Sequence, residues 1–234
     1  MRAAGVLLLL FLVMLGTSGA PAWAQPGAGL VAAYSFNEGN GTSVQDASGN
    51  GHTGTLSGAT WTPQGKFGAA LTFNGTTNWV TVNDSSRLDL STGMTLAAWV
   101  FPTSTTGVRD ILLKEGANAD IYNLYARNWR GRPEANVLVG GSNRTAEGPA
   151  ALSANVWTHV AGTYDGVTVR LFLNGVQVAS TAISGPIAAS TGPLRIGGNG
   201  LWGEFFQGSI DEVRLYNRAL TQAEIQTDML TPVN

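Results

Sequence analysis

Short apolar stretches alternate with polar, glycine-rich stretches along the chain from Leu30 onward. The apolar stretches are rich in branched and aromatic residues and are bounded by turn-forming residues, which predicts β-strands. Residues 94–101 (MTLAAWVF) are apolar at nearly every position, so we expect this strand at the centre of a sheet. Further strands are predicted at residues 30–36, 67–73, 79–82, 108–114, 121–127, 134–139 and 194–197.

The clearest pattern lies in residues 157–180, where three apolar stretches are separated by Asp165-Gly166 and Asn174-Gly175. Both dipeptides accommodate the positive φ angles of a type I′ turn, so the pattern predicts three strands joined by two tight hairpins. The sequence at residues 74–76 (NGT) predicts another hairpin turn, between the strands at 67–73 and 79–82.

Residues 209–220 (SIDEVRLYNRAL) begin as a strand and lead into a helix. Thr221 is followed three residues later by Glu224, which predicts a capping box at the start of this helix. The strand carries two adjacent acids, and neighbouring side chains of a strand point to opposite faces. We therefore expect Asp211 to face the first loop and Glu212 to face solvent, pairing with Arg214 or Arg218.

Many short strands and one helix predict an all-β fold, a two-sheet antiparallel jelly-roll sandwich with a short C-terminal helix. The sandwich domain is expected at residues 30–234, after a short leader at residues 25–29. Residues 1–24 are interpreted as a signal peptide, with a charged start, an apolar run at 6–15 and an Ala-x-Ala end. The apolar run is shorter than the roughly 20 residues that a membrane span needs. We therefore expect a secreted protein, extracellular or periplasmic according to the host, with no membrane insertion after signal cleavage.

The formal charge of the chain is −2, and it becomes −3 once Arg2 is removed with the signal peptide. This near-neutral balance argues against nucleic acid and anionic membranes as partners. The chain contains no cysteine, so burial of a core, and not disulfide bonds, must stabilise the fold.

Several motifs, in order along the chain, resemble one known family. They are YSFNEGNG and DASGNGHTGTL near the start, WTHVAGTYDG and GPLRIGG further on, and FFQGSIDEVRLYNRALTQAEI near the end. Together they resemble the laminin-G-like jelly roll of the concanavalin A-like lectin/glucanase superfamily, from about residue 30 to about residue 230. The resemblance implies two stacked antiparallel sheets and a last strand that pairs beside the first.

The resemblance also implies a structural calcium ion near the edge of the sheets. Its ligands would be Glu38, Asp46 and Asn50 in the loop at residues 37–55, together with Asp211 near the C-terminus. Calcium takes six to eight oxygen ligands in irregular geometry, which carboxylates, an amide and a glycine-rich backbone can supply. The alternative is that Asp46 caps its own Asx-turn and that Asp211 only forms hydrogen bonds with the first loop.

The sequence favours a non-catalytic protein. A retaining glycosidase needs two carboxyl groups about 5 to 5.5 Å apart on one face, and strand parity separates Asp211 from Glu212. Of the two histidines, His52 lies in the first loop and His159 lies within a strand, where a structural role is expected. A polysaccharide-active enzyme is therefore the less favoured interpretation.

Trp129 is the best candidate for ligand binding, because it stands in a predicted loop among Arg127, Arg130 and Arg132. Aromatic rings stack on sugar faces, and the guanidinium groups suit the carboxylate or sulfate of an acidic glycan. Trp202 is the second candidate. The alternative is that residues 127–132 form a solvated hairpin tip.

Of the other tryptophans, Trp79 is a third candidate, whereas Trp61, Trp99 and Trp157 have strand-like apolar surroundings that predict core positions.

Two functions remain open. One is a secreted glycan-binding module with a structural calcium ion. The other is a structural or adhesive extracellular protein that binds another protein or copies of itself.

Overall fold

The computed structural model of the chain describes Met1 and residues 27–234. Apart from Met1, the predicted signal peptide lies outside the described residues, as do residues 25 and 26 of the predicted leader. No helix in the described part of the chain has the length and apolar character to cross a membrane.

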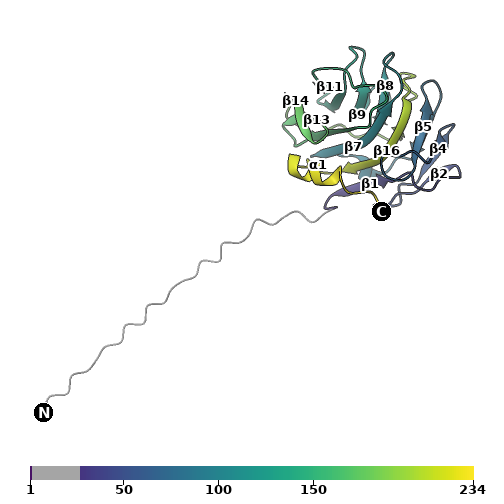
Figure 1. The fold of residues 1–234 in the computed structure, drawn as a ribbon. Helices are drawn as coiled ribbons and strands as arrows, with labels where there is room; N and C mark the ends of the chain where they lie inside the picture. Colours follow the sequence, from purple (N-terminus) through teal and green to yellow (C-terminus); the bar gives the residue numbers. More distant parts are fainter. Residues whose placement is uncertain (2–26) are drawn as a thin grey trace.

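Two antiparallel sheets make up the domain and confirm the predicted all-β sandwich (Figure 1). Sheet A has the order β14-β13-β12-β7-β16-β5-β4, with β1 also paired to β16. Its strands are β1 (Leu30–Tyr34), β4 (Thr60–Thr62), β5 (Ala70–Asn74), β7 (Met94–Pro102), β12 (Thr158–Tyr164), β13 (Thr168–Leu173), β14 (Val176–Ala182) and β16 (Gln207–Tyr216).

Sheet B has the order β11-β10-β9-β8-β15-β6-β3-β2. Its strands are β2 (Ser43–Val44), β3 (Gly54–Ser57), β6 (Trp79–Val82), β8 (Arg109–Glu115), β9 (Asp120–Arg127), β10 (Glu134–Val139), β11 (Ser142–Glu147) and β15 (Leu194–Ile196). The helical elements in the described residues are the 3-10 helix η1 (Ser86–Leu88) and the α-helix α1 (Gln222–Asp228).

The core lies between the sheets, and most strands contribute alternate residues to it. In β7, Leu96, Ala98 and Val100 belong to the main core, while Ala97 belongs to a second apolar cluster on the outer side of sheet A. In β9, Leu124 likewise faces the core. Strand parity therefore decides which side chains reach the outer faces, where ligands have access.

The last strand joins the first, as the resemblance implies. The first half of β16 pairs with β5, and its second half pairs with β1, where Tyr34 lies opposite Val213. The register shifts between Asp211 and Arg214, which marks a β-bulge at the junction of the two halves. Glu212 lies in this bulge with a φ of 55°, a conformation that non-glycine residues rarely adopt.

The prediction that Glu212 faces solvent is wrong, because its side chain is fully buried. The bulge turns it under the C-terminal segment, where its carboxylate accepts hydrogen bonds from Val233 N at 2.6 Å and Arg214 Nη2 at 3.0 Å. The predicted pairing with Arg214 is confirmed. The chain end is thereby fixed beside β1 (Figure 1).

Both hairpins predicted in residues 157–180 are present. At the second turn, Asn174 and Gly175 have φ angles of 49° and 75°, as a type I′ turn requires. The first turn differs, because only Gly166 has a positive φ there. Asp165 instead accepts two backbone N–H groups, from Val167 at 3.0 Å and from the next residue at 2.8 Å.

The hairpin predicted at residues 74–76 is wrong, because β5 belongs to sheet A and β6 to sheet B. Asn74 Oδ1 accepts the backbone N–H groups of Thr76 and Thr77 at 2.9 and 3.0 Å. These bonds fix a turn that carries the chain from one sheet to the other.

Helix α1 begins with the predicted capping box. Glu224 N donates to Thr221 Oγ1 at 3.2 Å, and Thr221 N donates to Glu224 Oε2 at 2.8 Å. Ile225 of the helix belongs to the apolar cluster on the outer side of sheet A, with Ala161 and Phe172. Part of that outer face is therefore covered by protein.

Candidate ligand-binding site

The outer face of sheet B is lined by polar side chains of adjacent strands. Because Leu124 and Val137 face the core, Asn123 and Tyr125 of β9 and Asn136 of β10 point outward. Outward side chains are ordinarily solvated, yet Asn123 is only 1% exposed and Asn136 only 2%. Neighbouring loops and side chains therefore surround a recess on this face.

We call this recess, of about 190 Å³, hollow B. Its wall includes Val108, Asn143 and Thr145, together with residues of the two loops that flank it. Its aromatic, acidic and amide residues are Asp120, Asn123, Tyr125, Asn128, Trp129, Glu134, Asn136, Trp202 and Glu204.

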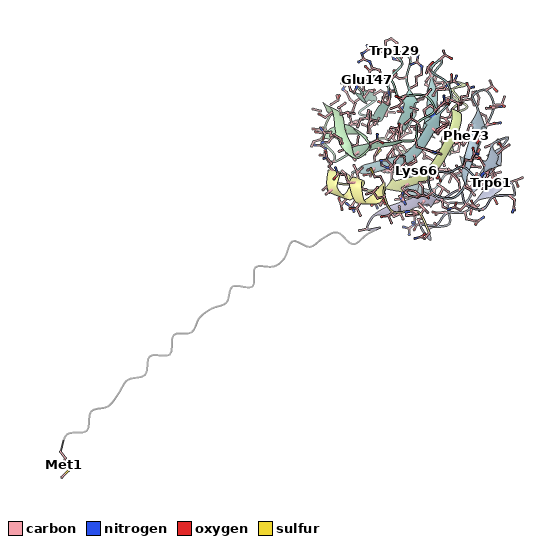
Figure 2. The ribbon with its side chains drawn as sticks, viewed as in Figure 1. Met1, Trp61, Lys66, Phe73, Trp129 and Glu147 are labelled. Carbon is pink, nitrogen blue, oxygen red and sulfur yellow. The ribbon has the colours of Figure 1, made fainter. Side chains whose placement is uncertain are left out.

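Both tryptophans that the sequence favours for ligand binding line hollow B. Trp129 is 76% exposed and Trp202 is 53% exposed, which is unusual for such large apolar side chains. They come from two separate loops, the β9–β10 connection and the β15–β16 connection. Figure 2 shows Trp129 at the outer edge of the molecule, near Glu147.

Each loop is held in shape by an asparagine. Asn128 Oδ1 accepts the backbone N–H groups of Arg130 and Arg132 at 2.9 and 3.0 Å. Asn199 Oδ1 accepts the N–H of Trp202 at 2.8 Å. The backbones that carry both exposed rings are therefore fixed before any ligand arrives.

The structure does not bring the three arginines into hollow B. Arg130 stacks on Trp129, with its guanidinium carbon 4.5 Å from the ring centroid, and lies 3.7 Å from Glu147. Arg132 Nη1 lies 3.3 Å from the same carboxylate. Arg127 lies against the backbone of Gly131. The arginines support the loop and Trp129, and they do not line the recess.

The floor of hollow B is a network of carboxylates and amides. Asp120 Oδ2 accepts hydrogen bonds from the amide groups of Asn123 and, at 3.0 Å, Asn136. Glu204 Oε2 accepts one from the Tyr125 hydroxyl at 2.5 Å. Asn123 Oδ1 is buried and has no hydrogen-bond partner among the residues that the structure describes. A ligand that donates a hydroxyl or amine proton would satisfy this acceptor.

Of the residues that the structure describes, three acids and no basic side chain line hollow B. Burial raises the pKa of Glu134 to about 7, and the nearby carboxylates Asp120, Glu147 and Glu204 act in the same direction, against a hydrogen bond from Asn128. Burial likewise raises the pKa of Tyr125, so its hydroxyl stays a proton donor. The site therefore favours a neutral or cationic ligand over an acidic one.

The predicted calcium ligands of the first loop hold the backbone. Asp46 Oδ1 accepts the N–H groups of Ala33 at 3.0 Å and Ser48 at 2.9 Å, and its Oδ2 accepts the N–H of His52 at 2.9 Å. The Asx-turn alternative for Asp46 is thus confirmed. Glu38 Oε1 accepts the N–H of the residue before Asp46 at 2.6 Å.

Asn50 and Asp211 are also engaged elsewhere. Asn50 Nδ2 donates to the carbonyl of Val31 at 2.9 Å. Asp211 Oδ2 accepts N–H groups of the β4–β5 loop, from Lys66 at 2.8 Å and Phe67 at 3.0 Å. The prediction that Asp211 bonds to the first loop is therefore wrong, because its carboxylate bonds to the β4–β5 loop instead.

The predicted calcium ligands do not converge in this structure. Among residues 27–234, no three histidine, aspartate or glutamate side chains are grouped so that they could hold a metal ion. Backbone N–H groups bind both carboxylate oxygens of Asp46 and of Asp211 and one oxygen of Glu38, whose Oε2 is buried without a partner among the described residues. Calcium binding stays a prediction.

The histidines lie away from the hollow lining. His159 is fully buried and packs edge-on against Trp99, with ring centroids 5.4 Å apart. Burial, with the neighbouring charge of Arg214, lowers the pKa of His159 to about 3, so it stays neutral. Its expected structural role is supported by this packing. His52 is also buried, and its carbonyl accepts the Tyr34 hydroxyl at 2.6 Å.

The predictions for the remaining tryptophans have mixed outcomes. Trp99 is buried as expected, and Trp61 is half-buried against the core. Trp157 is not a core residue: it lies on the outer face of sheet A against Phe101, with centroids 5.5 Å apart. Trp79 stacks on Phe205 and does not line hollow B.

Sequence reasoning missed the floor of the site. A signal was available in Asn123 and Asn136, which interrupt otherwise apolar or aromatic strands at positions of the outer face. The acids of the floor come from two neighbouring strands and a distant loop: Asp120 from β9, Glu134 from β10 and Glu204 from the β15–β16 loop. They meet because β9 pairs with β10 and because the β15–β16 loop lies beside these two strands.

Comparisons with known proteins agree with this architecture. The sequence model of the family described as the concanavalin A-like lectin/glucanases superfamily matches residues 74–226, well over half of the chain. Mouse (Mus musculus) pappalysin-1 is 40% identical over 80 residues, which cover 32% of this chain and 5% of that protein. Human (Homo sapiens) pappalysin-1 is 36% identical over the same length. The match thus spans a small fraction of these curated relatives.

Two solved structures resemble almost the whole domain. Domain 4 of AbnA, a GH43 extracellular arabinanase from Geobacillus stearothermophilus, in complex with arabinotriose, has a TM-score of 0.70 and 25% identity. The likeness covers 85% of this chain and 97% of that one. The binding domain of Paraclostridial Mosquitocidal Protein 1 has a TM-score of 0.70 at 16% identity, covering 87% and 52% of the two chains, and this likeness shows the fold alone.

Proposed function

The chain belongs to the concanavalin A-like lectin/glucanases superfamily, and from this premise we propose that it is a secreted, non-catalytic module that binds neutral glycans in hollow B. Its expected signal peptide supports secretion. The proposal replaces the acidic glycan expected from the three arginines, because the acids of hollow B would repel a carboxylate or sulfate.

One observation carries the proposal: two exposed tryptophans flank a floor of fixed hydrogen-bond acceptors. A sugar offers an apolar ring face, which suits Trp129 or Trp202, and hydroxyl groups, which suit carboxylate and amide oxygens. The unpartnered Asn123 Oδ1 supports the same ligand class, since a hydroxyl proton would satisfy it.

The non-catalytic part of the proposal rests on how the carboxylates are held. Glu134 accepts from Asn128, Glu204 from Tyr125 and Asp120 from Asn136. Each acid is thus a fixed acceptor within a network, in keeping with a site that orients hydroxyl groups. Incubation with neutral polysaccharides and measurement of newly formed reducing ends tests this part, and accumulation of product would contradict it.

Arabinotriose is the first probe, because the similar AbnA domain was solved in complex with it. Isothermal titration calorimetry with arabinotriose, xylotetraose, cellotetraose and mannotetraose would measure binding to the full chain. We expect at least one of these sugars to bind, and Trp129→Ala and Trp202→Ala each to weaken it about tenfold or more. Val167→Ala, an exposed apolar residue outside hollow B, is the control.

The adhesive alternative rests on the same exposed rings, since Trp129 and Trp202 would also suit a protein contact. Light scattering over a concentration series distinguishes the two functions. Assembly that depends on concentration and is lost in Trp129→Ala, together with no binding to the four sugars, would favour self-association over glycan binding.

A further inference from the structure

A second recess lies on the outer face of sheet A, beyond the part that α1 covers. It measures about 460 Å³ and crosses β4, β5, β16 and β7 as far as Trp157, which precedes β12. We call it groove A. Polar and aromatic residues of its lining include Thr72, Phe101, Trp157, Gln207 and Ser209.

Groove A is organised as a row across the strands. Phe101 of β7 lies opposite Ser209 of β16, and Ser209 lies opposite Thr72 of β5. The hydroxyl groups of Ser209 and Thr72 are 3.1 Å apart. Trp157 extends the row by packing on Phe101. An aromatic platform at one end is thus followed by aligned hydroxyl groups.

The chemistry of the groove points to a neutral, polyhydroxylated ligand. Among the described residues, its lining contains threonine, serine, asparagine and glutamine side chains beside three aromatic residues, Phe73, Phe101 and Trp157, and no charged residue. In the middle of groove A a peptide strand has no free backbone edge to pair with, because β16 is hydrogen-bonded to β5 on one side and β7 on the other, and the edge strand β4 lies at the rim. Recognition in the middle of the groove therefore uses side chains.

We propose that groove A is a second binding site for neutral oligosaccharides, separate from hollow B. One sugar ring lies against Trp157, and the hydroxyl groups of the next residues along the ligand bond to Ser209, Thr72 and Gln207. The outer faces of the two sheets point away from each other, so one molecule can hold two segments of polysaccharide. This inference shares only the ligand class with the proposed function, and either site can exist without the other.

Two-site binding raises the apparent affinity for a long or dense polysaccharide above that for a short oligosaccharide, through the high effective concentration of the second site. The test therefore follows each site separately. In ¹H–¹⁵N spectra, each of the six tryptophans that remain after removal of the predicted signal peptide gives one indole N–H signal, which tryptophan-to-phenylalanine variants assign. The full chain is titrated with the four sugars named above.

We expect the Trp157 signal to shift with at least one sugar, and to do so unchanged in a Trp129→Ala/Trp202→Ala double variant. Trp157→Ala should weaken that binding about tenfold, as followed on the amide signal of Ser209, while Val156→Ala, an exposed neighbour outside the groove, should not. Circular dichroism verifies that each variant is folded.

Two results would overturn the proposal. One is a Trp157 signal that stays in place with all four sugars up to their solubility limit. The other is a shift that disappears in the double variant, which would make it a secondary effect of hollow B. Shifts at Trp157 without shifts at Trp129 and Trp202 would support groove A and contradict the proposed function of hollow B.

Discussion

Glu134 and Glu147 lie directly opposite each other on β10 and β11, and the single amide group of Asn128 donates to both carboxylates, at 2.7 and 2.8 Å. Two acids at facing positions of a sheet repel each other unless a donor separates them. Asn128 supplies that donor from the loop that carries Trp129. The position of the aromatic ring is thus tied to the acids beside it.

Asn128→Ala should therefore affect both stability and binding. The substitution leaves two carboxylates without this donor and frees two backbone N–H groups of the loop. We expect a loss of about 1–3 kcal/mol in the free energy of unfolding, measured by urea denaturation. Glycan binding should also weaken, because the loop no longer fixes Trp129.

Asn143→Ala is the matched control, since Asn143 is an exposed asparagine that lines the same hollow. It should change the free energy of unfolding by less than about 0.5 kcal/mol. Equal losses in the two variants would contradict the role assigned to Asn128.

The raised pKa of Glu134 predicts that stability depends on pH. Its pKa rises from the usual 4.5 to about 7 in the folded protein, chiefly through burial. The folded state then holds the proton more tightly than the unfolded state, so this contribution to stability is full below pH 4.5 and is lost as the pH rises through 7. Between these limits we expect the Tm to fall with rising pH.

Glu134→Gln isolates this effect, because it keeps the hydrogen-bonding shape and removes the ionisation. The Tm of the variant should fall less between pH 5 and pH 7.5 than that of the natural chain, as followed by thermal unfolding at both values. Asp211 and Glu212 have pKa values raised by burial to about 6 and 7, so part of the slope should remain. Identical slopes in both proteins would contradict the assignment to Glu134.

Patterns of residue type predict the sandwich well, because they report burial directly. Residues 94–101 are apolar on both faces and lie in the middle of sheet A, as β7. Strand β11, in contrast, was not expected: it lies at the edge of sheet B, and its first three residues are exposed and polar. Edge strands need few apolar residues, so they leave a weak signal in the sequence.

The candidate site was likewise predicted only in part. Trp129 and Trp202 were predicted because an exposed tryptophan in a polar loop is conspicuous in a single stretch of sequence. The polar floor of hollow B was not predicted, since Asp120 and Glu204 are brought together only by the tertiary structure. The burial of Glu212 was missed because a bulge breaks the strict alternation on which the prediction depended.

Metal removal tests the calcium prediction against the hydrogen bonds observed at Asp46. Three backbone N–H groups hold its carboxylate, so Asp46→Ala should cost about 2–3 kcal/mol in the free energy of unfolding even without calcium. If these hydrogen bonds alone hold the loop, treatment with EDTA should leave the Tm of the natural chain nearly unchanged, as followed by thermal unfolding.

Glu38→Ala is the matched control, because Glu38 accepts a single backbone N–H. It should cost clearly less stability than Asp46→Ala. If EDTA lowers the Tm and added Ca²⁺ restores it, and if both variants lose that response, then the calcium prediction is confirmed and hydrogen bonds alone do not explain the loop.

The buried pair of Glu212 and Arg214 should make a large contribution to stability. Both side chains are almost fully enclosed, so removing Glu212 leaves the buried Arg214 with Asp228, 3.5 Å away, as its remaining acidic partner. We expect Glu212→Ala to cost about 3–5 kcal/mol in urea denaturation. Glu224→Ala, which removes the partly exposed acid of the capping box, should cost only about 1 kcal/mol.

The backbone of the bulge supplies a sharper comparison at the same position. Glu212 has a φ of 55°, which glycine adopts freely and alanine does not. Glu212→Gly and Glu212→Ala both remove the carboxylate that holds Arg214 and the N–H of Val233. The glycine variant should therefore be the more stable of the two, by about 1 kcal/mol. The reverse order would mean that the bulge relaxes once the carboxylate is gone, so that the ion pair itself creates the positive φ.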